Sequence, residues 1–130
     1  MSAKNLQPAG VDRSAEEALL ETIRSGYRER DVAKVLSAYA EDIESTIVNR
    51  NNPPSRPLVL RGRPALRRMV EDICSREMTH GVRDMIVGDG SLAYRVECRY
   101  PDGCNVVGLY MATVKDRLIV REFSVDCWDE

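Results

Sequence analysis

The chain has 130 residues, of which 43% are hydrophobic and 31% charged, and 19 basic against 21 acidic side chains give a formal net charge of −2. This length suits a single domain with its own hydrophobic core, and the composition excludes a largely disordered chain. No apolar run approaches the roughly 18 residues of a membrane-spanning helix, and the balanced charge argues against nucleic-acid binding. We therefore expect neither a membrane nor a nucleic acid as a partner.

The cysteines and the single histidine form no metal-binding pattern. Cys74, Cys98, Cys104 and Cys127 contain no Cys-x-x-Cys pair, and His80 alone cannot complete a zinc site. The first residues lack the apolar segment of a secretion signal. We therefore expect free thiols, a cytoplasmic location and no metal or other cofactor. The alternative for Cys98 and Cys104, which flank a predicted turn, is a redox pair.

The first part of the chain predicts an arm and two helices. Residues 1–13 show no periodic apolar pattern and predict a flexible arm. Ser14, followed three residues later by Glu17, resembles a capping box and predicts the start of a helix. Asp31 is the predicted N-cap of a second helix over 32–40.

The middle of the chain predicts a strand, a loop and a helix in turn. The β-branched run at 43–48 favours a strand. The density of proline and asparagine across 49–60 predicts a loop, because proline cannot donate to a β-ladder. Pro64 suits the first turn of a helix, and the apolar spacing that follows predicts this helix over 64–76.

After the third helix the apolar period changes to two, and short turns rich in glycine, aspartate and proline separate four predicted strands. These strands lie at 80–88, 92–100, 105–114 and 117–126. The order predicts one α+β domain over 14–130, with three N-terminal helices packed on a strongly curved mixed or antiparallel sheet. The concave side of such a cone is a natural small-molecule pocket.

Several short segments resemble the SnoaL-like proteins of the nuclear transport factor two superfamily. The matching segments are RERD at 28–31, SAYAED at 37–42, LRGRPAL at 60–66 and RLIVREF at 117–123, the last continuing to Asp126. The resemblance spans about residues 14–128. It implies a cystatin-like cone that binds a small molecule without a cofactor. Relatives include ketosteroid isomerase, limonene epoxide hydrolase and polyketide cyclases, besides non-catalytic binding and dimerisation proteins.

The ketosteroid isomerase pattern is not intact in this chain. That chemistry needs a carboxylate base, a tyrosine and a protonated carboxylic acid. By the resemblance, these three groups fall on Ile47, Ile23 and Gly108, none of which can supply them. The same steroid isomerase mechanism is therefore excluded.

The epoxide hydrolase pattern is retained only in part. Its Asp-Arg-Asp positions fall on Glu97, Arg99 and Phe123, so one carboxylate is missing. Its water-holding positions fall on Ser45 and Ile47. Epoxide hydrolysis with the same geometry is therefore not expected.

Glu97 is the leading candidate for a general base, although two orientations of its strand remain open. Arg95, Glu97 and Arg99 share one face, and apolar residues share the other. If the apolar face meets the helices, the charges are solvated. The resemblance favours the inward orientation, in which Glu97 is an ionised catalytic base and Arg99 or Arg121 binds a substrate oxygen, unless Arg121 only pairs with Glu97.

The remaining candidate site residues are expected to contact the substrate, with a packing role as the alternative for the two tyrosines and the histidine. These residues are Tyr39, Ser45, Ile47, His80, Tyr110 and Phe123.

The function expected from these observations is that of a cofactor-independent isomerase, cyclase or hydro-lyase acting on a cyclic or polyketide-like molecule by acid–base chemistry. The alternative is a non-catalytic ligand-binding or dimerisation module. Val107, Leu109 and Met111 alternate with further apolar residues, so both faces of their strand are apolar. Because helices can cover only one face, we expect a homodimer through the sheet.

Overall fold

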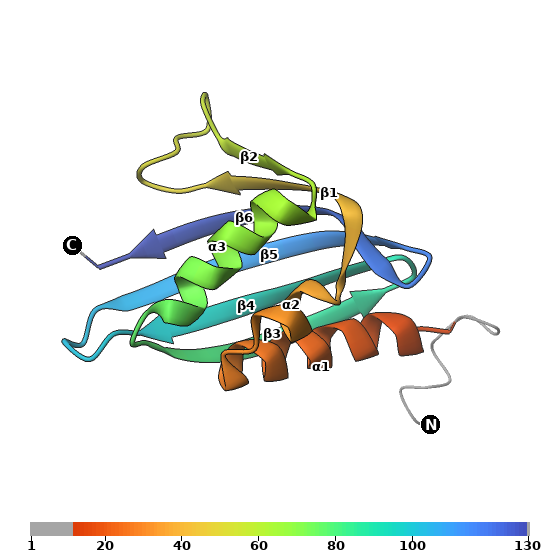
Figure 1. The fold of residues 1–130 in the computed structure, drawn as a ribbon, viewed down its shortest axis with the longest axis horizontal. Coiled ribbons are helices and arrows are strands. Elements are labelled where there is room, and N and C mark those ends of the chain that lie inside the picture. The colour runs from red at the N-terminus through yellow and green to blue at the C-terminus, as the bar shows by residue number, and fades with distance from the viewer. Residues whose placement is uncertain (1–11, 130) are drawn as a thin grey trace, which may run out of the picture.

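Three helices lie across one face of a six-stranded sheet in the part of the chain that the computed structural model describes, residues 12–129 (Figure 1). The predicted arm lies outside the described residues except for Asp12 and Arg13. The helices are α1 (Ser14–Glu29), α2 (Val32–Leu36) and α3 (Arg63–Ser75). The strands are β1 (Tyr39–Val48), β2 (Leu58–Arg61), β3 (Thr79–Gly88), β4 (Ser91–Arg99), β5 (Asn105–Lys115) and β6 (Leu118–Trp128).

The sheet has the strand order β2-β1-β6-β5-β4-β3 and is mixed. Strands β3 to β6 form the predicted antiparallel meander, whereas β1 pairs with β6 in the parallel direction. The predicted α+β class, with three helices on a mixed sheet, is confirmed. Figure 1 shows α3 crossing over the middle of the sheet, while α1 runs beside β3.

The two predicted helix starts have different outcomes. Arg13, rather than Ser14, is the N-cap of α1, and it makes no side-chain cap bond. The Ser14 amide donates instead to Asp12 Oδ1 at 2.9 Å, so the predicted capping box is wrong. Asp31 does cap α2, because its Oδ1 accepts from the Lys34 amide at 3.1 Å.

The second helix and the following loop are both shorter than the sequence predicted. Helix α2 ends at Leu36 instead of residue 40, because Ala38 O accepts from Ile119 N at 2.9 Å and directs the chain into the sheet. Pairing with β6 thus overrides the helical spacing of this segment. The predicted loop contains β2, which pairs with β1 at the sheet edge beyond the last proline.

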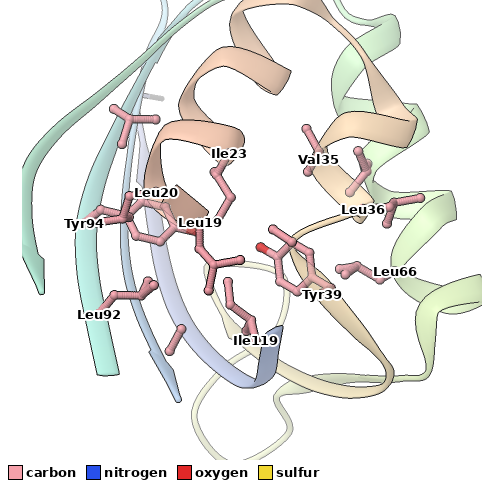
Figure 2. Close-up of a cluster of buried hydrophobic side chains, with 14 of the residues drawn as sticks. Leu19, Leu20, Ile23, Val35, Leu36, Tyr39, Leu66, Leu92, Tyr94 and Ile119 are labelled. Atoms are coloured by element: carbon pink, nitrogen blue, oxygen red, sulfur yellow. The ribbon is translucent and has the colours of Figure 1, made fainter. Parts of the chain in front are cut away.

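The hydrophobic core fills one end of the space between the helices and the sheet. Ile23, Val35, Leu66 and Ile119 are at most 1% exposed. Figure 2 shows these side chains meeting from α1, α2, α3 and β6, with the Tyr39 hydroxyl directed into the cluster. The cluster continues to Tyr94 and Val96 on β4, which also border the cavity described below.

Candidate functional site

A cavity of about 470 Å³ lies between α3 and the concave face of the sheet. Its sheet residues come mainly from positions 94–98 of β4, 106–110 of β5 and 126–128 of β6, with Ile47, Leu58 and His80 from the other three strands. Tyr94 and Val96 belong both to this wall and to the hydrophobic core. Most of its exposed wall is apolar. Prominent wall residues are Tyr27, Met69, Tyr94, Val96, Tyr110 and Trp128.

Asp126 brings a carboxyl group into this apolar wall. Burial raises its pKa above the usual range for aspartate, while a hydrogen bond with Tyr110 acts in the opposite direction. A carboxyl group whose pKa moves toward neutrality can exchange protons with a ligand in either direction. Asp126 is therefore the best-placed acid–base group in the cavity.

Gly108 makes room for the Asp126–Tyr110 pair. A Cβ atom at position 108 would lie 2.5 Å from Asp126 Oδ1 and 2.8 Å from a ring carbon of Tyr110. Both distances are shorter than real Cβ contacts. The absence of a side chain at this position on β5 thus allows the carboxyl group and the phenol to converge over the strand.

Glu122 is a second carboxyl group on the concave face of β6, and it is only 2% exposed. It accepts hydrogen bonds from the Tyr39 hydroxyl at 3.0 and 3.1 Å and from the Tyr94 hydroxyl at 3.0 Å. Burial raises the pKa of Glu122 to about 7, although these two hydrogen bonds lower it and the charge of Asp126 raises it further. The two carboxyl groups are therefore electrostatically coupled.

Aromatic rings join the two carboxyl groups. The rings of Tyr94 and Tyr110 are stacked, with centroids 4.9 Å apart and planes only 3° from parallel. Tyr94 bonds to Glu122, and Tyr110 bonds to Asp126. This stack forms a flat, rigid section of the cavity wall against which a planar ligand could pack.

A histidine–cysteine pair lies on the same wall. His80 Nδ1 is 3.2 Å from the Sγ atom of Cys98, and the imidazole ring packs against Tyr27 with centroids 5.5 Å apart. Burial, together with the charge of Arg30, lowers the pKa of His80. Burial raises the pKa of Cys98 to about 11, so this thiol stays protonated at neutral pH.

The predicted substrate contacts divide into cavity residues and core residues. Ile47, His80 and Tyr110 line the cavity. Tyr39 and Ser45 lie beneath the helices, at 2% and 1% exposure, and do not line it. The hydroxyl of Tyr39 binds Glu122, so its position in the structure is that of a core residue.

Glu97, the predicted base, lies on the convex face of the sheet, outside this cavity. Its carboxylate pairs with Arg83 at 3.2 Å and Arg95 at 3.1 Å, and its side chain is 40% exposed. Arg99 shares this face, where both residues line a separate hollow of about 460 Å³. The inward orientation of this strand is thus wrong, because Tyr94, Val96 and the other even-numbered residues carry the apolar face to the helices.

The positions of Arg121 and Phe123 also differ from the expectation. Both are exposed on the convex face, Phe123 at 45%. The β5–β6 register shifts where Thr113 pairs with Arg121 and Val114 pairs with Ile119, which leaves Val120 as an extra residue. This bulge places Ile119 on the concave face but turns Arg121 and Phe123 away from it.

Asp126 and Glu122 were not among the residues predicted for the site from the sequence. Both belong to the segment used for the family resemblance, but the assumed strand parity placed them outside. The alternation of Glu122 and Ser124 with Phe123 and Val125 favours the apolar residues facing inward, so the local sequence gives no signal of the reversed faces.

The described residues contain no group of three or more histidine, cysteine or acidic side chains placed to hold a metal ion. Within residues 12–129 no helix has the length and hydropathy needed to cross a membrane. Cys74, Cys98, Cys104 and Cys127 are free thiols in this structure.

Comparisons with known proteins agree on the fold. The SnoaL-like domain family matches residues 19–122. No curated protein matches the chain. An NTF2-like protein of unknown function from Mesorhizobium loti has a TM-score of 0.75 at 21% identity, covering 93% of this chain and 97% of its own.

Two further solved structures share this fold. A Kribbella flavida DSM 17836 protein, provisionally assigned as a ketosteroid isomerase, has a TM-score of 0.76 at 20% identity, over 94% of this chain and 83% of that one. A computationally designed 17-OHP binder has a TM-score of 0.65 at 12% identity, over 88% and 96% of the two chains. At these identities the likeness concerns the fold alone.

Proposed function

Since the chain belongs to the SnoaL-like domain family, we propose that it binds a small cyclic molecule in the concave cavity and acts on it by acid–base chemistry without a cofactor. The reaction class is isomerisation, cyclisation or elimination of water. The observation that carries this proposal is the Asp126 carboxyl group, which lies in an apolar wall next to a phenol and has a raised pKa.

In the proposed mechanism Asp126 removes a proton from a ligand carbon or hydroxyl group and returns it at a second position. Burial makes its ionised form a stronger base than an exposed aspartate. The Tyr110 hydroxyl holds the carboxyl group in place, and its stacking on Tyr94 fixes the phenol ring. Glu97 with its partners Arg83 and Arg95, and Arg99, take no part, because they lie on the other face.

The test is catalysed hydrogen–deuterium exchange in D2O, followed by NMR on a panel of cyclic ketones and β-diketones. We expect wild type to accelerate exchange next to the carbonyl, and Asp126→Asn to reduce this rate by about 10²–10⁴-fold. Glu97→Gln is the matched control, because it removes the same charge from the convex face. Equal rates in wild type and Asp126→Asn would contradict the proposed base.

The second candidate is a non-catalytic ligand-binding module. It is favoured by one observation, namely that Ile47 and Gly108 line the cavity where ketosteroid isomerase chemistry requires carboxyl groups. The designed 17-OHP binder shows that a protein of this fold can serve as a binder. Saturable ligand binding without exchange on any ketone of the panel would favour this candidate.

The proposal includes a homodimer formed through the convex face, in the cytoplasm. Five large apolar side chains on β5 and β6 are between 38% and 66% exposed on that face. They are Val107, Leu109, Met111, Phe123 and Val125. The registers Leu109–Val125 and Met111–Phe123 make them one continuous patch, which a second copy of the same patch would cover.

A further inference from the structure

The cavity wall carries an acidic group without a basic partner. No ion pair within residues 12–129 includes Asp126. Among the described residues lining the cavity, Arg76 is the one arginine or lysine. Its guanidinium group is held by Asp72 at 2.7 Å and by the Tyr100 hydroxyl at 2.8 Å. The charge of Arg76 is therefore already balanced by Asp72.

A second carboxyl group adds to the negative potential. Glu122 lies behind Tyr94 and, like Asp126, has no ion-pair partner among the described residues. Its hydrogen-bond donors, Tyr39 and Tyr94, are neutral phenols. Two buried carboxyl groups that lack a cation are costly to ionise, and this cost falls when a positive charge enters their surroundings.

The aromatic residues of the cavity wall also favour a positively charged ligand. The faces of tyrosine and tryptophan rings attract cations, most strongly where water is excluded. The stacked pair Tyr94–Tyr110 stands between the two carboxyl groups, and three more aromatic side chains complete the wall. These are Tyr27, Tyr100 and Trp128.

We propose that the cavity selects a small cyclic ligand carrying a positive charge, an amine or quaternary ammonium group, which is received by Asp126 and the Tyr94–Tyr110 stack. This inference names the substrate class of the proposed function and rests on it. A cation in this position neutralises Asp126, lowers the cost of ionising Glu122 and contacts the aromatic rings. The same two carboxyl groups and aromatic ring faces would repel an anionic ligand.

The affinity for a cation should rise with pH as Asp126 and Glu122 ionise. Of the other groups facing them, Arg30 carries a positive charge that acts on His80, and its guanidinium is held by the carbonyls of Cys74 and Met78. Burial raises the pKa of the four tyrosines and of the thiol, and it lowers that of the imidazole, so all six remain neutral near pH 7. They are Tyr27 on α1, Tyr39 on β1, His80 on β3, Tyr94 and Cys98 on β4, and Tyr110 on β5. At the C-terminal end of α3, Asp72 and the C-cap residue Arg76 balance each other.

The experiment compares three probes with the same ring and different charge: benzyltrimethylammonium, benzyl alcohol and benzoate. Trp128 is the single tryptophan of the chain and lines the cavity, so its fluorescence reports binding directly. At pH about 8 we expect wild type to bind the cation about tenfold more tightly than the alcohol, and benzoate least tightly. This preference should weaken steadily as the pH is lowered, because the pKa of Glu122 is about 7 and burial raises the pKa of Asp126.

Two variants distinguish the effect of a carboxyl group in the cavity from that of one on the outer surface. Asp126→Asn should lose most of the preference for the cation but still bind the alcohol, and Glu97→Gln should behave as wild type. Should either variant fail to fold, the pH series on wild type gives the same test without a substitution.

Two results would overturn the inference. Equal affinity for the cation and the alcohol would show that the ligand class is wrong while the cavity still binds ligands. Binding of none of the three probes would also reject it. The proposed function is judged separately, by hydrogen exchange on the neutral ketones, so the two failures remain distinguishable.

Discussion

The concave and convex faces of the sheet each carry a glutamate, but one is buried and the other is partly exposed to solvent. Glu122 faces the helices, where two phenols bind it and burial raises its pKa to about 7. Glu97 faces outward, 40% exposed, between Arg83 and Arg95. Since both are glutamates on strands of one sheet, only the side to which each points separates a perturbed carboxyl group from a surface ion pair. Strand parity therefore decides which residues can perform chemistry.

The largest effect is expected from filling the space above Gly108. Gly108→Val would place a side chain against Asp126 Oδ1 and the Tyr110 ring, so both groups must move. We expect ligand affinity or exchange activity to fall by at least about 10²-fold, and the free energy of unfolding to fall by about 1–3 kcal/mol. Fluorescence titration and urea melts measure the two effects.

The control for this substitution is the neighbouring residue on the opposite face. Leu109 is 57% exposed, so Leu109→Val should leave ligand affinity within about twofold of wild type and stability within about 0.5 kcal/mol. Similar losses of affinity and stability in both variants would mean that the face on which a β5 residue lies does not determine its effect on the site.

The pH dependence of stability tests the buried carboxyl group. The pKa of Glu122 is about 7 in the folded chain against an ordinary value of 4.5, so between these values the folded state binds the proton more tightly than the unfolded state. The free energy of unfolding should therefore fall as pH rises from about 4.5 to about 7, by about 2–3 kcal/mol from this group. The raised pKa of Asp126 adds a fall of the same sign.

Urea melts across this pH range check the prediction with two variants that each remove a single carboxylate. Glu122→Gln should flatten the curve, whereas Glu97→Gln should reproduce the wild-type slope. A wild-type slope that persists in Glu122→Gln would assign the pH dependence to other groups.

The exposed apolar patch on the convex face allows the proposed dimer interface to be tested by mutation. Met111 is 66% exposed and pairs with Phe123, so Met111→Glu would place a charge in the centre of the proposed dimer interface. We expect the self-association constant to weaken by at least about tenfold while the circular dichroism spectrum is unchanged. Light scattering at tens of micromolar measures the mass, and a wild-type monomer under these conditions would refute the dimer.

The smallest effect is expected from the surface glutamate itself. Glu97→Gln removes an exposed carboxylate from its two arginines, and exposed pairs of this kind stabilise proteins little. We expect the free energy of unfolding to change by less than about 0.5 kcal/mol in a urea melt. A loss above about 1 kcal/mol would indicate that this ion-pair cluster is covered in the assembled protein.

The sequence predicted the fold well because the relevant signals are local. Asp31 as a cap, Pro64 in a first turn and the short hairpin turns each act within a few residues. The end of α2 and strand β2 were not predicted, because both depend on partners distant in the chain. Ala38 is drawn into the sheet by Ile119, and β2 forms only against β1.

The site was predicted less well because one extra residue in β6 reverses which of its side chains face the cavity. The cavity residues Ile47, His80 and Tyr110 were identified, since their strands keep regular alternation in this region. The extra residue at Val120 moved Arg121 and Phe123 outward. For Glu97, both orientations were left open, and the apolar alternation of its own strand indicated the correct face whereas the family resemblance indicated the wrong one.

The parallel pairing of β1 with β6 has a consequence for how the protein forms during translation. Tyr39 and Glu122, which meet in the core, are separated by 83 residues. A ribosome adding about 5–20 residues per second needs roughly 4–17 s to cross that interval. Until β6 emerges, one edge of β1 has no sheet partner, and Glu122 and Asp126 are still missing. The nascent chain is therefore expected to depend on chaperones during this interval, and to acquire its binding capacity only when β6 joins the sheet.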